Sequence, residues 1–221
     1  MSDLRDWLRG PDIRRLNHWI SFNIARTFPG HEHRLSDDGV QADCVMEPKD
    51  MDEVEIVNYD PRWPVLFDEE ARRLRGVLDP SLIVGLEHFG STAIPGLSAK
   101  PIIDILIAVR SLADAQATVV EALRNLDYVY WADNPKKDRM FFVKGMPPFG
   151  SRRSHHVHVT EPNGEMWQRL AFRDYLRAHP EEAGTYERLK RRLAAEHQTD
   201  REAYTDAKSA YVETVMRKAV K

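Results

Sequence analysis

The sequence predicts an α+β fold, in which a β-sheet is backed by helices and followed by a helical C-terminal part. Short runs rich in branched and aromatic residues, separated by polar turns, occupy the middle of the chain and are typical of strands. Helical spacing of apolar residues precedes the first long run, and it returns after Asn163 and continues to the end of the chain. These patterns together give the fold class.

Six segments are expected to form strands. The run 102–109 is apolar on both faces apart from Asp104, as in a strand that is covered on both sides. The segment 155–160 instead alternates between polar residues and valine, so one of its faces is polar. The expected strands cover residues 54–57, 82–88, 102–109, 127–131, 140–143 and 155–160.

Capping residues mark the expected helix starts. A carboxylate followed by proline, or a hydroxyl residue with an acidic residue three positions later, satisfies free N–H groups of a first helical turn. The first helix is expected to end at about Val77. The expected starts lie at Asp60-Pro61, at the capping box Ser111-x-x-Asp114, at Asn163, at Pro180 and at the capping box Thr199-x-x-Glu202.

Composition limits the class of protein. The chain has 221 residues, of which 42% are hydrophobic and 30% are charged, which fits one soluble domain or a domain with an appendage. A net charge of -3 gives no strong signal for nucleic-acid binding. Cys44 is the only cysteine, so we expect no internal disulfide and a reducing cytoplasmic location. No apolar run approaches the roughly 20 residues of a membrane span. The oligomeric state is left open.

Residues 1–50 are expected to form an N-terminal extension of unclear role, either packed on the main body or used as a partner-binding arm. The main domain is expected to cover residues 51–221. His31 and His33 stand in a polar stretch of the extension. We expect them to be solvated loop residues rather than a metal site, because no carboxylate or cysteine has ligand spacing nearby.

The stretch 86–109 carries the main chemical signal. Gly90 and Ser91 follow an apolar run, and backbone N–H groups and a hydroxyl at such a junction can hold an anion, usually a phosphate. Thr92 is included in the expected phosphate site. The next apolar run is interrupted only by Asp104, a carboxylate that needs a cation, a donor or a proton if it is buried.

This arrangement matches the pattern of the nucleotidyltransferase superfamily in part. The pattern is an apolar residue, Gly, Gly or Ser, about a dozen residues, and then Asp-apolar-Asp on the next strand. Gly90 and Ser91 stand where the pattern requires them, and Asp104 falls at the second Asp. Ile102 replaces the first Asp, which matters because two-metal phosphoryl chemistry needs clustered carboxylates.

A second polar face lies on the segment 155–160. His156 and His158 share one face of this strand, and we expect them to face the same cleft as Asp104 from a neighbouring strand. Asp104, Glu87, His156 and His158 are the candidate metal ligands. Lys100 is the candidate catalytic partner of Asp104 for the developing charge, and cationic candidates for the anion lie in the C-terminal part at Lys190 and Lys208.

From about Val54 to Ala219 the chain resembles the GrpB family, a group sometimes found fused to dephospho-coenzyme A kinase. The resemblance implies a nucleotidyltransferase-like fold, a small mixed sheet backed by helices with a helical C-terminal part. The family itself has isoleucine at the position of the first catalytic Asp. The matching segments are VEIVNYDPRWPVLFDEEARRLR, LEHFGSTAIPGLSAKPIIDILI, HHVHVTE, LAFRDYLRAHPEEAGTYERLKRRLA and YTDAKSAYVE.

Three functions are compatible with these residues. The first is transfer of a nucleotidyl or phosphoryl group to an unknown acceptor with Mg²⁺ or Mn²⁺, with Asp104 and Lys100 as catalytic residues. The second is a non-catalytic module that binds a nucleotide or coenzyme in a degenerate site. The third is hydrolysis at a histidine and aspartate site that holds Zn²⁺ or Mn²⁺, and Zn²⁺ is the weaker expectation.

Overall fold

The computed structural model describes residues 53–220, and the expected N-terminal extension, with His31 and His33, lies outside this range. The strands are β1 (Ile83–Phe89), β2 (Ile103–Val109), β3 (Tyr128–Tyr130), β4 (Arg139–Lys144) and β5 (His155–Thr160). The helices are α2 (Trp63–Val77), the 3-10 turn η3 (Ser91–Ala93), α3 (Leu112–Arg124), α4 (Glu165–Gln168), α5 (Leu170–Ala178), α6 (Pro180–Glu196), α7 (Arg201–Ala207) and α8 (Ser209–Ala219).

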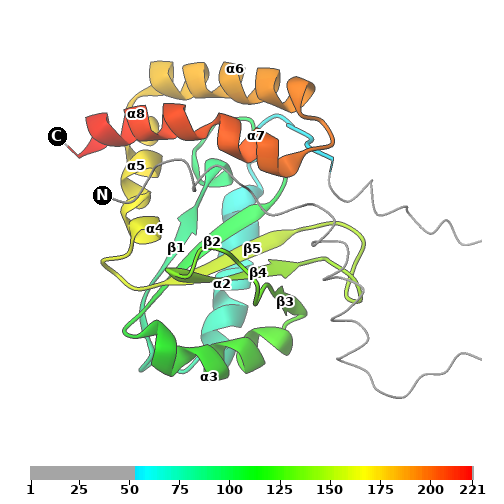
Figure 1. The fold of residues 1–221 in the computed structure, drawn as a ribbon, viewed down its shortest axis with the longest axis vertical. Coiled ribbons are helices and arrows are strands. Elements are labelled where there is room, and N and C mark those ends of the chain that lie inside the picture. Colours follow the sequence, from blue (N-terminus) through cyan, green and yellow to red (C-terminus); the bar gives the residue numbers. More distant parts are fainter. Residues whose placement is uncertain (1–52, 221) are drawn as a thin grey trace, which may run out of the picture. The chain divides into compact units, whose positions relative to one another are not determined.

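The five strands form one mixed sheet in the order β1-β2-β5-β4-β3 (Figure 1). The central pair β2 and β5 is parallel, and the other neighbouring pairs are antiparallel. The register of the parallel pair places Asp104 opposite His156. The predicted α+β class, a mixed sheet backed by helices with a helical C-terminal part, is confirmed.

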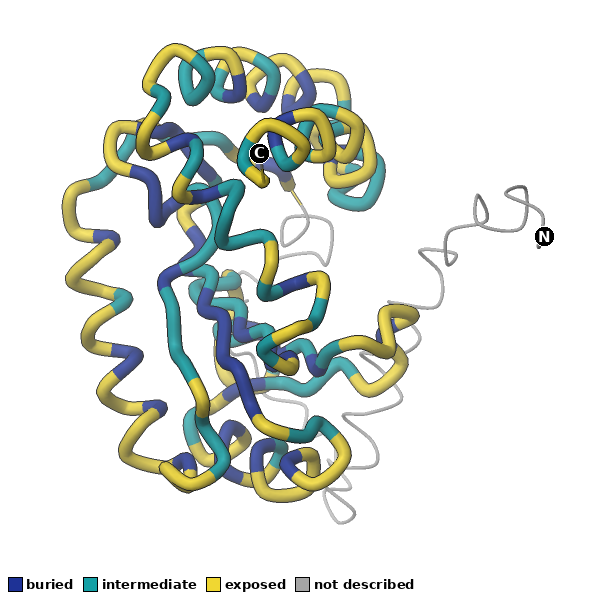
Figure 2. Tube along the Cα trace, turned by 90° about the vertical axis from the view of Figure 1, so that its left-hand side faces the viewer, coloured by how far each residue is buried: buried dark blue, intermediate teal, exposed yellow. Residues whose placement is uncertain are grey.

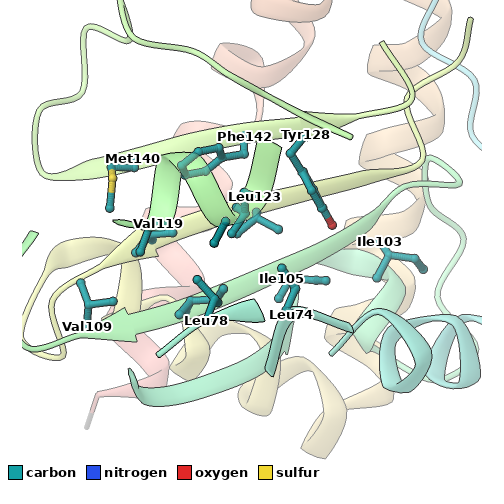
Figure 3. Packing of buried hydrophobic residues seen from close by; sticks show 14 of the residues in the cluster. Leu74, Leu78, Ile103, Ile105, Val109, Val119, Leu123, Tyr128, Met140 and Phe142 are labelled. Atoms are coloured by element: carbon teal, nitrogen blue, oxygen red, sulfur yellow. The ribbon is translucent and has the colours of Figure 1, made fainter. Parts of the chain in front are cut away.

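One face of the sheet packs against α2 and α3 and forms the main core. Ile103 and Ile105 of β2 lie in this core (Figure 3). Ile107 of β2 and Val157 and Val159 of β5 belong to the same buried cluster. Burial of each such side chain contributes about 1.5–3 kcal/mol. Because side chains alternate along a strand, the residues between them lie on the opposite face of the sheet. That opposite face is called the open face below.

A second core joins the loop after β1 to the helical part. Ile94 and Leu97 of this loop are buried against Leu176 of α5, Tyr186 of α6 and Val215 of α8. Figure 2 shows buried residues on the inner sides of these C-terminal helices and exposed residues on their outer sides. The loop that carries Gly90 and Ser91 is therefore held between the sheet and the C-terminal helices.

Two predicted helix starts are confirmed, one by its cap and one by its first residue. The Ser111 hydroxyl accepts a hydrogen bond from the backbone N–H of Asp114 at 3.3 Å, so the first capping box does cap α3. Pro180 is the first residue of α6, where its fixed φ and missing N–H do no harm.

Other boundaries were predicted wrongly by one or two residues. The first helix begins at Trp63, because the Asp60 carboxylate accepts from the N–H of Arg62 in a turn before the helix. Asp200 rather than Thr199 caps α7, with 2.9 Å from its carboxylate to the N–H of Ala203. Gly164 rather than Asn163 precedes α4, and the predicted C-terminal helix is divided into α4 and α5. Adjacent polar residues compete for a cap, and tertiary packing decides between them.

The predicted strand over residues 54–57 is also wrong. Only Val57 pairs here, in an isolated antiparallel bridge with Ala99. Val54 instead packs against Leu193 and Tyr204 of the helical part, so this segment is held by the helices rather than by the sheet. Within residues 53–220, no helix has the length and apolar composition needed to cross a membrane.

Candidate anion-binding site

Asp104 and His156 form a hydrogen-bonded pair on the open face. The Nδ1 atom of His156 lies 3.0 Å from Oδ1 of Asp104. Burial opposes ionisation of Asp104, but this hydrogen bond and the charges of neighbouring groups outweigh it and lower the pKa of the carboxyl. An ionised carboxylate only accepts, so we assign the proton of the bond to Nδ1 of His156.

His156 and His158 share the open face with Asp104, as predicted. Burial lowers the pKa of His156 to about 4 and that of His158 to about 3, so both imidazoles are neutral at pH 7. The Nε2 atom of His156 and the Nδ1 atom of His158 are buried, and neither has a hydrogen-bond partner within the part of the chain that the structure describes. Such atoms call for a ligand or an ordered water.

Gly90 approaches Asp104 more closely than other residue types allow. Its φ of 71° lies in the left-handed region, and a Cβ added to it would overlap Oδ2 of Asp104. Strand β1 ends at Phe89, and the 3-10 turn η3 starts at Ser91, so the predicted junction between strand and helix is confirmed. The phosphate contact and the cleft expected beside these residues stay predictions.

Ser91 and Thr92 differ in what their hydroxyl groups contact. The side chain of Ser91 is half-buried and interacts with the hydroxyl of Tyr186. Burial raises the pKa of Tyr186 to about 12, and the interaction with Ser91 partly offsets this rise. Thr92 is 1% exposed, and its hydroxyl lies 3.1 Å from Nε2 of His88 and donates to the carbonyl of Ile102. The Thr92 hydroxyl is therefore already engaged inside the protein, whereas the Ser91 side chain is partly exposed.

Cationic side chains surround Asp104. Burial lowers the pKa of Lys100 well below its usual value, and Arg201 and Lys208 lower it further, whereas Asp104 raises it. Burial lowers the pKa of Lys208 to about 8, against the effect of Asp104. The positive charge of Arg153 also lowers the pKa of both Lys100 and His156. Among residues 53–220, no carboxylate lies within ion-pair distance of the ammonium group of Lys100 or Lys208.

Two candidate site residues are engaged elsewhere. Glu87 lies on the open face, but its carboxylate is 2.8 Å from Nη1 of Arg173 on α5. Lys190 is 2% exposed, and its ammonium group donates to the carbonyl of Ser98. Burial lowers the pKa of Lys190 to about 7. The roles of Glu87 as a metal ligand and of Lys190 as an anion contact stay predictions.

The residues present do not fit a divalent cation held by the protein alone. Mg²⁺ and Mn²⁺ prefer several oxygen ligands. Asp104 already gives one oxygen to His156, and Glu87 is paired with Arg173. Within the described range, no three of the residues His, Cys, Asp and Glu are grouped so that they could hold a metal ion.

Sequence reasoning missed the tyrosines of the site. Tyr186 and Tyr204 stand at helical spacing in the sequence, and both side chains are buried. The ring of Tyr204 also lies 3.9 Å from Nζ of Lys208 and 5.4 Å from Nζ of Lys100, measured to its centroid. These cation–π contacts hold two lysines in place. Tyr204 and Lys208 are four positions apart, a helical spacing, but Lys100 comes from a distant part of the chain, so no local pattern shows the three together.

A known protein family matches nearly all of the part of the chain that the structure describes. A sequence model of the GrpB protein family matches residues 53–218. The chain belongs to the GrpB family. A UPF0157 protein of Pseudomonas aeruginosa is 48% identical over 172 residues, which is 77% of this chain and 69% of that protein. The glutamate-rich protein GrpB of Alkalihalophilus pseudofirmus is 34% identical over 165 residues, 74% of this chain and 94% of that protein.

A solved structure confirms the GrpB fold. The crystal structure of conserved protein GrpB from Enterococcus faecalis superposes with a TM-score of 0.67 at 34% sequence identity, and the match covers 75% of this chain and 97% of that one. A dephospho-CoA kinase of Mycolicibacterium paratuberculosis is 30% identical over 189 residues. This match covers 75% of this chain but 46% of the kinase, so the GrpB-like region is about half of that protein.

Proposed function

We propose that the site at Asp104 binds the phosphate groups of a nucleotide or a nucleotide-derived coenzyme. The observation that carries this proposal is the cluster of basic side chains around one carboxylate. Lys100 and Lys208 both contact the ring of Tyr204, Asp104 raises the pKa of both, and neither has a described carboxylate partner at ion-pair distance. A phosphate dianion is the ligand that balances such a group of cations.

Polar groups of the loop complete the proposed site. The Ser91 hydroxyl lies at the start of η3, where an anion also gains from free backbone N–H groups. The buried Nε2 of His156 accepts a hydrogen bond when its Nδ1 donates to Asp104, so it can receive a hydroxyl of the ligand. Lys100, Lys208 and Ser91 thus bind phosphate, and His156 orients a hydroxyl group.

The dephospho-CoA kinase relative makes a coenzyme precursor the first ligand to test. That protein carries additional sequence beyond the matching half, so its kinase activity is not transferred to this chain. A nucleotide with a short phosphate chain offers the same anionic groups. Both ligand types are therefore included in the experiment.

A second candidate function adds transfer of a nucleotidyl or phosphoryl group to an acceptor. It is favoured by the position of Asp104, one strand away from the Gly90-Ser91 junction and in contact with it. Because the protein ligands do not fit a resident metal, Mg²⁺ or Mn²⁺ would have to arrive with the phosphates. Hydrolysis at a Zn²⁺ site of histidine and aspartate is less well supported, because no suitable ligand group occurs among the described residues.

Thermal unfolding of the full chain tests the proposal. We expect ADP, ATP, dephospho-coenzyme A or pyrophosphate to raise the melting temperature, because a ligand at a hundredfold excess over Kd stabilises by about 2.7 kcal/mol. Lys208→Met should abolish the shift. Lys218→Met is the matched control, since this lysine is exposed and pairs with Glu182 rather than with a residue of the proposed site.

The result that overturns the proposal is the absence of a shift with every probe, or an equal shift in wild type and Lys208→Met. Adding Mg²⁺, Mn²⁺ or Zn²⁺ to each probe separates the candidates. A shift that needs no metal supports binding alone, whereas a shift that appears only with Mg²⁺ or Mn²⁺ favours transfer. Turnover is then measured as loss of the probe and gain of product by chromatography.

A further inference from the structure

The loop from His88 to Ser98 is bound by cations of the helical C-terminal part at three points. Nη1 of Arg173 donates to the carbonyl of His88 at 2.7 Å, just before Gly90. Nε and Nη2 of Arg177 both donate to the carbonyl of Ala93, at 3.0 and 2.7 Å. Lys190 donates to the carbonyl of Ser98 at the end of the loop.

These contacts are specific rather than a general charge attraction. The guanidinium of Arg173 is 9% exposed and also binds Glu87 and Asp174, so its charge is already balanced by two carboxylates. What it adds to the loop is a directed hydrogen bond to a backbone carbonyl. Charge-assisted hydrogen bonds of this kind are shorter and stronger than those between neutral groups.

Arg177 binds the loop at the end of η3, through two hydrogen bonds to one carbonyl. Ala93 is the last residue of η3, whose carbonyl groups at that end have no partner within such a short turn. The fork of Arg177 satisfies the Ala93 carbonyl from two nitrogens. The neighbouring residue Ile94 is buried in the core of the helical part, so the same peptide is fixed on both sides.

We infer that Arg177, with Arg173 and Lys190, is a positioning residue that fixes the loop carrying Gly90 and Ser91. This inference rests on the proposed function for its ligand, but the fixed loop is a property of the free protein. The helical part then does more than cover the sheet. It sets the place of the Ser91 hydroxyl and of the Gly90 backbone beside Asp104, and it thereby sets the affinity for phosphate. α5 and α6 lie at the end of the sheet where β1 leads into η3 (Figure 1).

The first measurement is amide hydrogen exchange of residues 90–98 in the full chain without ligand. Arg177→Gln removes both donors to Ala93 and should speed exchange in this segment by about tenfold or more, because the loop then opens locally. Arg192→Gln is the matched control, because Arg192 lies on α6 with its side chain 67% exposed and pairs only with Glu196 among described carboxylates. Its exchange in residues 90–98 should equal that of the wild type.

The second measurement is calorimetric titration with pyrophosphate and with ADP. Arg177→Gln should weaken binding by about tenfold or more, because a loop displaced by about 1 Å loses contacts that depend on geometry. Arg177→Lys restores the charge and one donor, so it should recover part of the affinity. A purely electrostatic role predicts full recovery by lysine and an equal loss in Arg192→Gln, and that result overturns the inference.

The two proposals fail in different ways. Unchanged exchange of residues 90–98 in Arg177→Gln overturns the inference even if nucleotides bind. If the wild type binds no probe but Arg177→Gln loosens the loop, the fixed loop stands and the proposed function fails. Arg177→Lys keeps the apolar stem and the charge, so it also serves as the test variant if the glutamine variant does not fold.

Discussion

Asp104 accepts a hydrogen bond from Nδ1 of His156 over 3.0 Å, between positions that are directly paired in the parallel strands β2 and β5. This pair gives the carboxylate a donor in a largely apolar strand. It also fixes which nitrogen of His156 carries the proton. The pair therefore has a structural role in the free protein, and it leaves Nε2 of His156 as the acceptor for a ligand.

Asp104→Asn tests the structural role of this pair. The substitution keeps the shape of the side chain but removes the negative charge that accepts the hydrogen bond from His156 and interacts with the neighbouring lysines. We expect the ligand-free protein to lose about 1–3 kcal/mol of unfolding free energy. Denaturant unfolding at pH 7 measures the loss, and Asp133→Asn, at an exposed position, is the control. Equal or greater stability of Asp104→Asn would show that the carboxylate is held for function at a cost to the fold.

Gly90→Ala tests the close approach to Asp104. The added methyl group would overlap Oδ2 of Asp104 and would also strain a backbone with positive φ. We expect a loss of about 2–4 kcal/mol of stability together with weaker binding of pyrophosphate. Gly96→Ala is a matched control, because Gly96 has a similar φ but open space around its Cβ position. Its loss should stay near 1 kcal/mol, about the cost of backbone strain alone. Similar losses at the two glycines would contradict the steric explanation.

Glu70 should make stability depend on acid pH. Burial opposes its ionisation, but the hydrogen bond from Lys144 at 2.8 Å and the charge of that lysine outweigh burial and lower the pKa of Glu70 below its usual 4.5. Because the pKa of Glu70 is lower in the folded protein than in the unfolded chain, the unfolded chain binds the proton more tightly. The stabilisation is therefore complete above pH 4.5 and is lost as the pH falls through the folded pKa.

Glu70→Gln should remove this dependence. At pH 7 it should destabilise by about 2–4 kcal/mol, because Lys144 and the Tyr128 hydroxyl lose a buried ionised partner. The difference between wild type and variant should shrink between pH 7 and a pH well below the usual 4.5, because the carboxyl of Glu70 then takes up a proton. Chemical unfolding at both pH values measures it. The exposed neighbour Glu69 provides the control variant Glu69→Gln. A constant difference at the two pH values contradicts the prediction.

Lys100→Met should separate binding from stability. Burial lowers the pKa of Lys100, so the folded protein resists a charge at this position. We expect the variant to be as stable as the wild type at pH 7 or more stable, and to bind pyrophosphate at least about tenfold more weakly. Unfolding and titration of the same preparations measure the two effects. A variant that is less stable but binds normally would assign Lys100 to the fold rather than to the ligand.

Local residue patterns were sufficient for the five strands of the sheet, although not for the segment 54–57, and for the shared face of the site residues. The alternation in 155–160 showed that His156 and His158 share a face, and the apolar run around Asp104 showed a buried strand. Ser111 and Asp114 showed the start of α3 because a cap is completed within one turn of the chain. Each of these signals depends on residues that are at most a few positions apart.

Tertiary structure alone decided what the polar residues contact. Pairing of β2 with β5 joins residues 52 positions apart, and no local pattern sets this register. Arg173 pairs with Glu87, and the ammonium group of Lys190 donates to the carbonyl of Ser98. The physical reason is that burial and partner choice depend on how separate segments pack. Sequence periodicity fixes which face a side chain occupies, but the neighbour across that face comes from a distant part of the chain.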